Sequence, residues 1–133
     1  MNHGDYNPIP TYVEKVASQI INSAYNIHSE YGPGLLEKAY EFCLFHDLND
    51  QAFSVKSQVA LPIHHHDHKL YGAYRMDLIV NDCIVVEVKT VESLQPIHRS
   101  QLLTYLRIGG YRLGLLINFN TISLKEGIKR VVN

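Results

Sequence analysis

Apolar residues in the first part of the chain recur with the spacing of an α-helix. From Thr11 to His28, an apolar residue returns every third or fourth position, which predicts an amphipathic helix with one buried stripe. Thr11 followed three residues later by Glu14 has the pattern of a capping box, so we expect the helix to begin there. Gly32-Pro33-Gly34 breaks the chain. A second helix is then expected from about Leu35 to Leu48, with a stripe formed by Leu36, Ala39, Tyr40, Cys43 and Asp47.

The middle of the chain changes to the alternation that is typical of β-strands. One strand pattern begins at Phe53 and continues to Ile63, and a second runs from Leu70 to Val80 after a polar interruption. A third pattern, Ile84 to Lys89, follows the pair Asn81-Asp82, which is typical of hairpin turns. We expect these three strands to form an antiparallel meander.

The last third of the chain predicts one more helix and one or two strands. Pro96 suits the first turn of a helix, and Gly109-Gly110 suits its end. Tyr111 to Phe119 is almost entirely apolar, as expected for a strand that is covered on both faces. The segment from Ile122 to Val132 alternates weakly and predicts at most a short edge strand.

This order of elements, α, α, β, β, β, α, β, predicts an α/β fold with a mixed central sheet flanked by helices. We expect residues 1–133 to form one domain with a loose tail at residues 1–9. The chain is 46% hydrophobic and 19% charged, which is typical of globular proteins and argues against disorder.

Charge and targeting patterns narrow the choice of partners. The net charge of −1 provides no overall basic field, so binding to nucleic acid would depend on local charge or on a metal ion. No segment has the pattern of a signal peptide or the length of a membrane span, so we expect a cytoplasmic protein without a membrane partner. Cys43 and Cys83 are expected to be buried, reduced thiols.

Three charged residues, Asp77, Glu87 and Lys89, interrupt the apolar hairpin. Strand alternation places Glu87 and Lys89 on one face. A two-residue loop at Asn81-Asp82 would put the two acids on opposite faces, whereas a three-residue loop ending at Cys83 would set their Cβ atoms roughly 5 Å apart. We favour the second register because only it forms a metal site. The alternative is a solvated strand face that carries a surface ion pair between Glu87 and Lys89.

A metal ion would resolve the repulsion between two close carboxylates. Burial of two unpaired carboxylates would be costly, and each would oppose the ionisation of the other. Mg²⁺ prefers a few carboxylates and several waters in octahedral geometry. The favoured register of the hairpin therefore predicts a divalent cation between Asp77 and Glu87, with the positive charge of Lys89 beside it.

The order of these residues resembles the PD-(D/E)XK nuclease superfamily, in which an aspartate precedes a strand bearing Glu-x-Lys, here residues 87–89. Gln101 and Tyr105 match the Gln-x-x-x-Tyr motif of the RecB-like branch. Residues 34–40 match the pattern that names the GxxExxY family. The resemblance covers residues 13–132 and implies a restriction-endonuclease-like αβββαβ core. It also implies a divalent metal site and hydrolysis of phosphodiester bonds in DNA, or alternatively in RNA.

The resemblance further implies a role for each motif residue. Asp77 and Glu87 would bind Mg²⁺ or Mn²⁺, with the backbone carbonyl of Val88 as a third ligand. Glu37 would reach the metal from its helix, directly or through water; without the motif it reads as a surface glutamate. Lys89 would orient the attacking water, help to deprotonate it, or stabilise the charge of the transition state, and the sequence leaves these three roles open.

Two further motif residues share one face of the third predicted helix. Gln101 and Tyr105 are four residues apart and would brace the Lys89 side of the site or contact a substrate phosphate. The alternative for this pair is a tyrosine at the margin of the core beside an unrelated glutamine. His98 lies one turn earlier and is a weaker candidate for a phosphate contact. We expect Tyr40 to lie in the core.

Residues 64–68, His-His-His-Asp-His, match no part of this scheme. Histidines at alternate positions of a strand would share a face and could hold zinc or nickel. We favour the alternative that they form a solvated hairpin tip.

Two other functions stay open from the sequence. The chain could be a nuclease-fold module that binds nucleic acid or protein without cutting, or a dimeric scaffold. Because so small a core offers little surface for a duplex, we expect a homodimer or a partner protein in either case.

Overall fold

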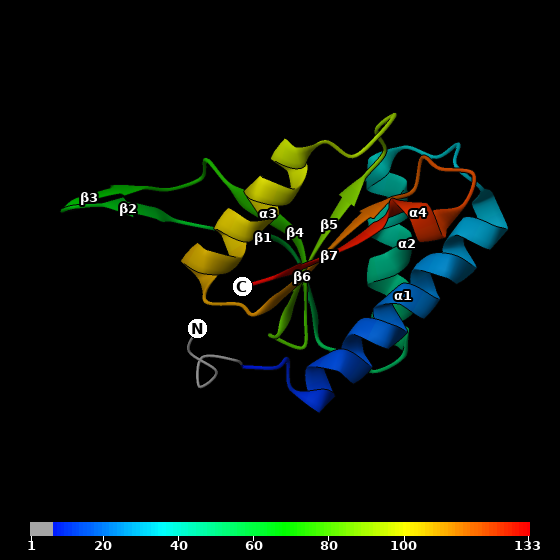
Figure 1. The fold of residues 1–133 in the computed structure, drawn as a ribbon, viewed down its shortest axis with the longest axis horizontal. Helices are drawn as coiled ribbons and strands as arrows, with labels where there is room; N and C mark the ends of the chain where they lie inside the picture. Colours follow the sequence, from blue (N-terminus) through cyan, green and yellow to red (C-terminus); the bar gives the residue numbers. More distant parts are fainter. Residues whose placement is uncertain (1–6) are drawn as a thin grey trace, which may run out of the picture.

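The computed structural model describes residues 7–133, which form a mixed five-stranded sheet with helices on both faces (Figure 1). The strands lie in the order β1-β4-β5-β6-β7, and only β5 and β6 run parallel. This arrangement confirms the predicted α/β class and is consistent with a restriction-endonuclease-like fold. The strands of the sheet are β1 Val55–Ala60, β4 Arg75–Val80, β5 Ile84–Lys89, β6 Leu113–Asn118 and β7 Ile128–Val132.

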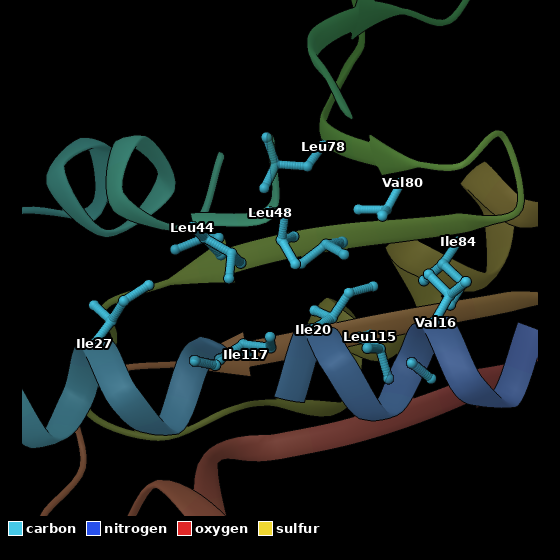
Figure 2. Close-up of a cluster of buried hydrophobic side chains, with 14 of the residues drawn as sticks. Val16, Ile20, Ile27, Leu44, Leu48, Leu78, Val80, Ile84, Leu115 and Ile117 are labelled. Atoms are coloured by element: carbon cyan, nitrogen blue, oxygen red, sulfur yellow. The ribbon is translucent and has the colours of Figure 1, made fainter. Parts of the chain in front are cut away.

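Two apolar cores lie between the sheet and its helices, one on each face. Helices α1 and α2 cover one face, α3 covers the other, and the short α4 precedes β7 (Figure 1). On the first face, Ile20 of α1 and Leu44 of α2 pack against Leu78 of β4 (Figure 2). The smaller core under α3 includes Leu102 and Leu116. The helices are α1 Thr11–Tyr31, α2 Glu37–Asp50, α3 Pro96–Gly109 and α4 Leu124–Gly127.

The predicted capping box at the start of α1 is wrong. The helix begins at Thr11, but its N-cap is Pro10, and no side chain caps it. Glu14 instead accepts two hydrogen bonds from the Arg130 guanidinium of β7, at 2.6 and 2.8 Å. Glu14 therefore forms a tertiary ion pair with β7 in place of a local cap. This pair connects α1 to the edge strand of the sheet.

The second helix begins two residues later than predicted. The break that starts at Gly32 continues through Leu36, which is exposed, so the buried stripe is shifted in phase. Tyr40, Leu44 and Leu48 form the buried stripe at intervals of four residues. Of the other predicted positions, Ala39, Cys43 and Asp47 are only half-buried.

The two strands predicted from Phe53 to Ile63 and from Leu70 to Val80 are each interrupted. Strands β2 Ile63–His65 and β3 His68–Leu70 form a separate antiparallel ribbon that projects beyond the sheet beside α3 (Figure 1). The turn residue His66 has φ +54°, and every histidine of the ribbon is exposed. Within residues 7–133, no three His, Cys, Asp or Glu side chains form a group that could hold a metal. The histidines therefore lie at an exposed hairpin tip, as predicted.

The ends of the chain are partly as expected. Strand β6 is buried along its whole length, and the weak pattern near the C-terminus forms β7 after the unpredicted α4. Of the expected loose tail, residues 1–6 lie outside the described part. Ile9, however, packs against the core, and the Asn7 carbonyl accepts a hydrogen bond from Arg112. Cys43 and Cys83 are free thiols, but they are half-buried rather than buried.

In the described part of the chain, no helix combines the length and the apolar character needed to cross a bilayer.

Candidate functional site

The hairpin between β4 and β5 has the register that brings the two acids together. Val80 pairs with Ile84 across a three-residue loop, in which Asn81 and Asp82 adopt left-handed φ values of +50° and +52°. Asn and Asp tolerate that conformation better than most residues do. The three-residue loop is thus confirmed. Continuing its register sets Asp77 opposite Glu87, and the two-residue alternative is excluded.

The two strands separate at this level, and carboxylates replace the ladder between them. The Asp77 backbone N–H donates to Glu87 Oε2 at 2.7 Å, and the Val88 N–H donates to Asp77 Oδ2 at 2.9 Å. Each acid therefore binds the backbone of the opposite strand. The reciprocal bonds fix the two side chains in one gap between β4 and β5.

A kink in the neighbouring edge strand opens the same level from the other side. In the β1–β4 register, Gln58 lies opposite Asp77, but this pair is missing from the ladder and Gln58 has φ +51°. Both strands change faces here. Val55 and Leu78 pack in the α1–α2 core, whereas Val59 and Met76 pack in the α3 core. The interruption leaves Asp77 half-buried at a notch in the sheet.

Two residues that the sequence did not single out contact this notch. The Gln58 side-chain amide donates to Glu41 Oε1 at 2.7 Å and to Asp77 Oδ1 at 3.4 Å. Glu41 lies on α2, one turn after Glu37, and is half-buried, while Glu37 is exposed. Helical spacing from Glu37 could have suggested Glu41. No sequence signal points to Gln58, because its role depends on a positive φ within a strand.

The carboxyl groups hold protons more tightly than they would in water. Burial, and then the charge of Asp77, raises the pKa of Glu87 to about 8. Burial also raises the pKa of Asp77, although the Val88 N–H and the charge of Lys89 oppose this. The pKa of Glu41 is raised for the same first reason, and Asp77 and Glu37 add to it. The site is therefore short of positive charge.

Lys89 lies at the end of β5, and its backbone is held firmly. The Phe119 N–H donates to the Lys89 carbonyl at 2.9 Å. The buried Asn118 side chain accepts from the Val91 N–H at 3.1 Å and donates to the Val91 carbonyl at 2.9 Å. The charge of Lys89 lowers the pKa of Asp77 and of Glu87, so its ammonium group acts on both acids.

The two residues of the Gln-x-x-x-Tyr motif differ in burial and in their relation to the acids. Tyr105 is buried, and its pKa is raised by burial first and then by the charge of Glu87. This coupling indicates that the phenol lies near the carboxylates. Gln101 is exposed one turn earlier on the same face of α3. His98 Nδ1 accepts a hydrogen bond from the Gln95 N–H at 2.9 Å, so this histidine caps the helix.

Tyr40, the last residue of the Gly-x-x-Glu-x-x-Tyr pattern, organises the chain before the site. Its hydroxyl donates to the Gly32 carbonyl and accepts from the Leu35 N–H at 3.0 Å. Its ring stacks on Phe119 with centroids 4.3 Å apart. The expected core position of Tyr40 is confirmed, and the tyrosine fixes the loop from which α2 and its glutamates begin.

The oxygen donors in the gap fit a hard divalent cation. The N–H and C=O of one strand residue point to the same edge, so the Val88 carbonyl faces β4 as its N–H does. The gap thus offers two carboxylates and one backbone oxygen. Mg²⁺ and Mn²⁺ accept such sets and complete them with water, whereas zinc prefers nitrogen and sulfur ligands. A bound cation would also relieve the raised pKa values.

A comparison with protein families agrees with these elements. The model of the PD-(D/E)XK nuclease superfamily matches residues 14–131, from the first turn of α1 to β7. Neither the curated proteins nor the solved structures include a match. The matched segment contains the two acids of the β4–β5 gap, Lys89 and the Gln101–Tyr105 pair.

Proposed function

Since the chain belongs to the PD-(D/E)XK nuclease superfamily, we propose that it is a divalent-metal-dependent nuclease that hydrolyses phosphodiester bonds in DNA. The observation that carries the proposal is the reciprocal bonding of Asp77 and Glu87 to the backbone of the opposite strand. These bonds hold the two acids in one gap, which the Val88 carbonyl also faces. The placement in the GxxExxY branch, on Gly34, Glu37 and Tyr40, is part of the same proposal.

In this proposal Asp77, Glu87 and the Val88 carbonyl hold Mg²⁺ or Mn²⁺. When bound, the metal would lower the pKa of a water molecule and neutralise charge on the phosphoryl oxygens. Helix α2 would supply a further carboxylate, directly or through water. Glu37 is the candidate from the motif. Glu41 is the candidate from geometry, because Gln58 connects it to Asp77.

The residues around the acids complete the scheme. Lys89 places a positive charge beside both carboxylates, where it orients the attacking water or offsets the charge of the pentacovalent transition state. The charge of Glu87 helps to raise the pKa of Tyr105, and this tyrosine would border the α3 side of the gap. Gln101, exposed one turn away, would contact a phosphate of the substrate.

Cleavage of fluorescently labelled DNA in Mg²⁺ or Mn²⁺ tests this function. The wild type should cut, while Asp77→Asn and Lys89→Ala should lose at least about a hundredfold in rate, the size of effect expected when a transition-state group is removed. Glu92→Gln removes a carboxylate from an exposed loop position and serves as the matched control. Equal rates in all four proteins, each with an unchanged circular dichroism spectrum, would refute the proposal.

The contribution of α2 can be measured separately. Glu37→Gln and Glu41→Gln are compared for Mn²⁺ affinity by isothermal titration calorimetry and for cleavage rate. If the helix supplies a metal contact, one of them should weaken Mn²⁺ binding roughly 10- to 100-fold, the usual effect of losing a supporting group at a metal site. Wild-type affinity in both variants would remove α2 from the metal site.

A further inference from the structure

A groove of about 480 Å³ follows the exposed face of α3 on the side nearest the β2–β3 ribbon. Ile97, Gln101, Thr104 and Ile108 form one helical stripe along it, and Ile63 and Tyr74 form the opposite wall. Its volume lies within the ~300–1,000 Å³ of typical ligand sites. The groove contains Gln101 and Tyr105 of the proposed site, and its other lining residues have no part in the proposed metal chemistry.

The walls of this groove are apolar but open to solvent. Ile97 is 69% exposed and Tyr74 is 41% exposed. The Tyr74 ring stands edge-on to Tyr105, with centroids 6.3 Å apart. Contiguous exposed apolar groups next to an aromatic ring mark a binding surface. They suit a ligand with flat, apolar faces.

The two segments that form the groove are also basic. Residues 61–76 and 96–109 together carry Lys69, Arg75, Arg99 and Arg107 against the single acid Asp67, a net charge of +3. The whole chain carries −1, so the remainder carries −4. All four cationic residues are exposed. This asymmetry favours a polyanion on the α3 side, since the potential extends about 8–10 Å at ordinary ionic strength.

One residue joins the groove to the catalytic gap. Tyr105 lines the groove, and the charges of Glu87 and Asp77 both act on its phenol. Tyr105 is therefore the residue that the groove shares with the surroundings of the acids, and a ligand lying along α3 would reach it.

We propose that this groove binds a segment of single-stranded DNA, with unpaired bases packed against Tyr74, Ile97 and Ile108. The inference deepens the proposed nuclease function and rests on it. Unpaired bases present their π-faces to aromatic and apolar side chains, while the phosphates remain free to meet the basic surroundings. A duplex keeps its bases stacked inside and would leave the exposed apolar residues unused. The groove thus selects the strand and leads it past Tyr105 to the acids.

The test is fluorescence anisotropy with labelled oligothymidylate in EDTA, so that binding is measured without cleavage. Oligothymidylate should bind more tightly than a duplex of equal length, and its affinity should fall with salt. Tyr74→Ala should weaken binding about 5- to 100-fold, as expected for the loss of one base stack, and Tyr74→Phe should restore it. Ile97→Ser should also weaken binding. Ile122→Ser changes a 92% exposed isoleucine outside the groove and should bind as the wild type does.

Several results would overturn the inference. These are unchanged affinity in Tyr74→Ala and Ile97→Ser, equal or tighter binding of the duplex, and tighter binding of oligouridylate. Sedimentation that shows a dimer dissociated by Ile97→Ser would assign the groove to self-association instead. Because the assay contains no metal, loss of groove binding and loss of Mg²⁺-dependent cleavage are separate outcomes. Cleavage that persists in Tyr74→Ala with unchanged binding would refute only the groove.

Discussion

Replacing Glu87 with glutamine should stabilise the metal-free protein increasingly as the pH rises above 4.5, the ordinary pKa of a glutamate carboxyl. Glu87 is only 5% exposed, and burial beside Asp77 raises its pKa from 4.5 to about 8. The folded protein therefore keeps this carboxyl protonated at pH values where the unfolded chain ionises it. Glutamine is neutral in both states, and its side-chain oxygen can still accept the Asp77 N–H.

The size of the effect follows from the shift. Between the pKa of the unfolded chain and that of the folded protein, the native state binds one more proton, so its free energy of unfolding falls by about 1.4 kcal/mol for each pH unit. The stability associated with Glu87 is fully present below 4.5 and is lost as the pH rises towards 8. At pH 7 the free energy of unfolding of the wild type should therefore be about 3 kcal/mol lower than that of Glu87→Gln.

Urea denaturation of metal-free protein, followed by circular dichroism from about pH 5 to pH 8, measures this difference over the linkage window. The stability of the wild type should fall across the range, whereas that of Glu87→Gln should change less with pH. The curve of the variant should keep some slope of the same sign, because the pKa values of Asp77 and Glu41 are also raised. Glu92→Gln, at an exposed position, should follow the wild type. Parallel curves for the wild type and Glu87→Gln would refute the assignment of a proton to the buried carboxyl.

Adding Mg²⁺ should stabilise the wild type more at the alkaline end of this pH range, because the proton that the metal displaces from Glu87 is held less tightly there.

Three substitutions outside the acids should affect stability in different degrees. Tyr40→Phe removes a hydroxyl that serves two backbone groups and should cost about 1–3 kcal/mol in urea denaturation. Asn118→Leu leaves the Val91 N–H without a side-chain partner and the Val91 carbonyl with Asn120 alone. It should cost a similar amount and lower the cleavage rate, because the segment that follows Lys89 is then less firmly held. A double-mutant cycle between Glu14 and Arg130 should give less than about 1 kcal/mol, as for other exposed pairs, despite its two short bonds.

The sequence predicted the acid pair well because strand alternation and turn chemistry are local rules. Asp77 and Glu87 depend on one choice, the length of the loop between β4 and β5, and Asn81 and Asp82 accept the left-handed backbone that the three-residue loop requires. The burial of β6 and the ends of α3 follow from equally local signals.

Errors arose where a distant contact decides the local structure. Glu14 has the spacing of a capping residue, yet Arg130, more than a hundred positions away, takes its carboxylate. The start of α2 depends on how Tyr40 binds the preceding loop, which shifted the buried stripe away from Leu36. The importance of Gln58 follows from a backbone conformation that no residue preference indicates.

The kink at Gln58 accounts for the way a buried sheet can carry a charged site. In a regular β1–β4 ladder every second residue would stay on the same face, and Asp77 would share the α3 face with Ile79. Because both strands change faces at this level, Asp77 is turned towards the gap, with Gln58 on one side and Glu87 on the other. The left-handed φ of Gln58 costs of order 1 kcal/mol or more, and glycine would remove that cost. Gln58→Gly should therefore leave the fold nearly as stable while freeing Glu41 and Asp77 from their shared donor. A lower affinity for Mn²⁺ in that variant would show that the strained glutamine positions the acids, and wild-type affinity would show that the kink alone suffices.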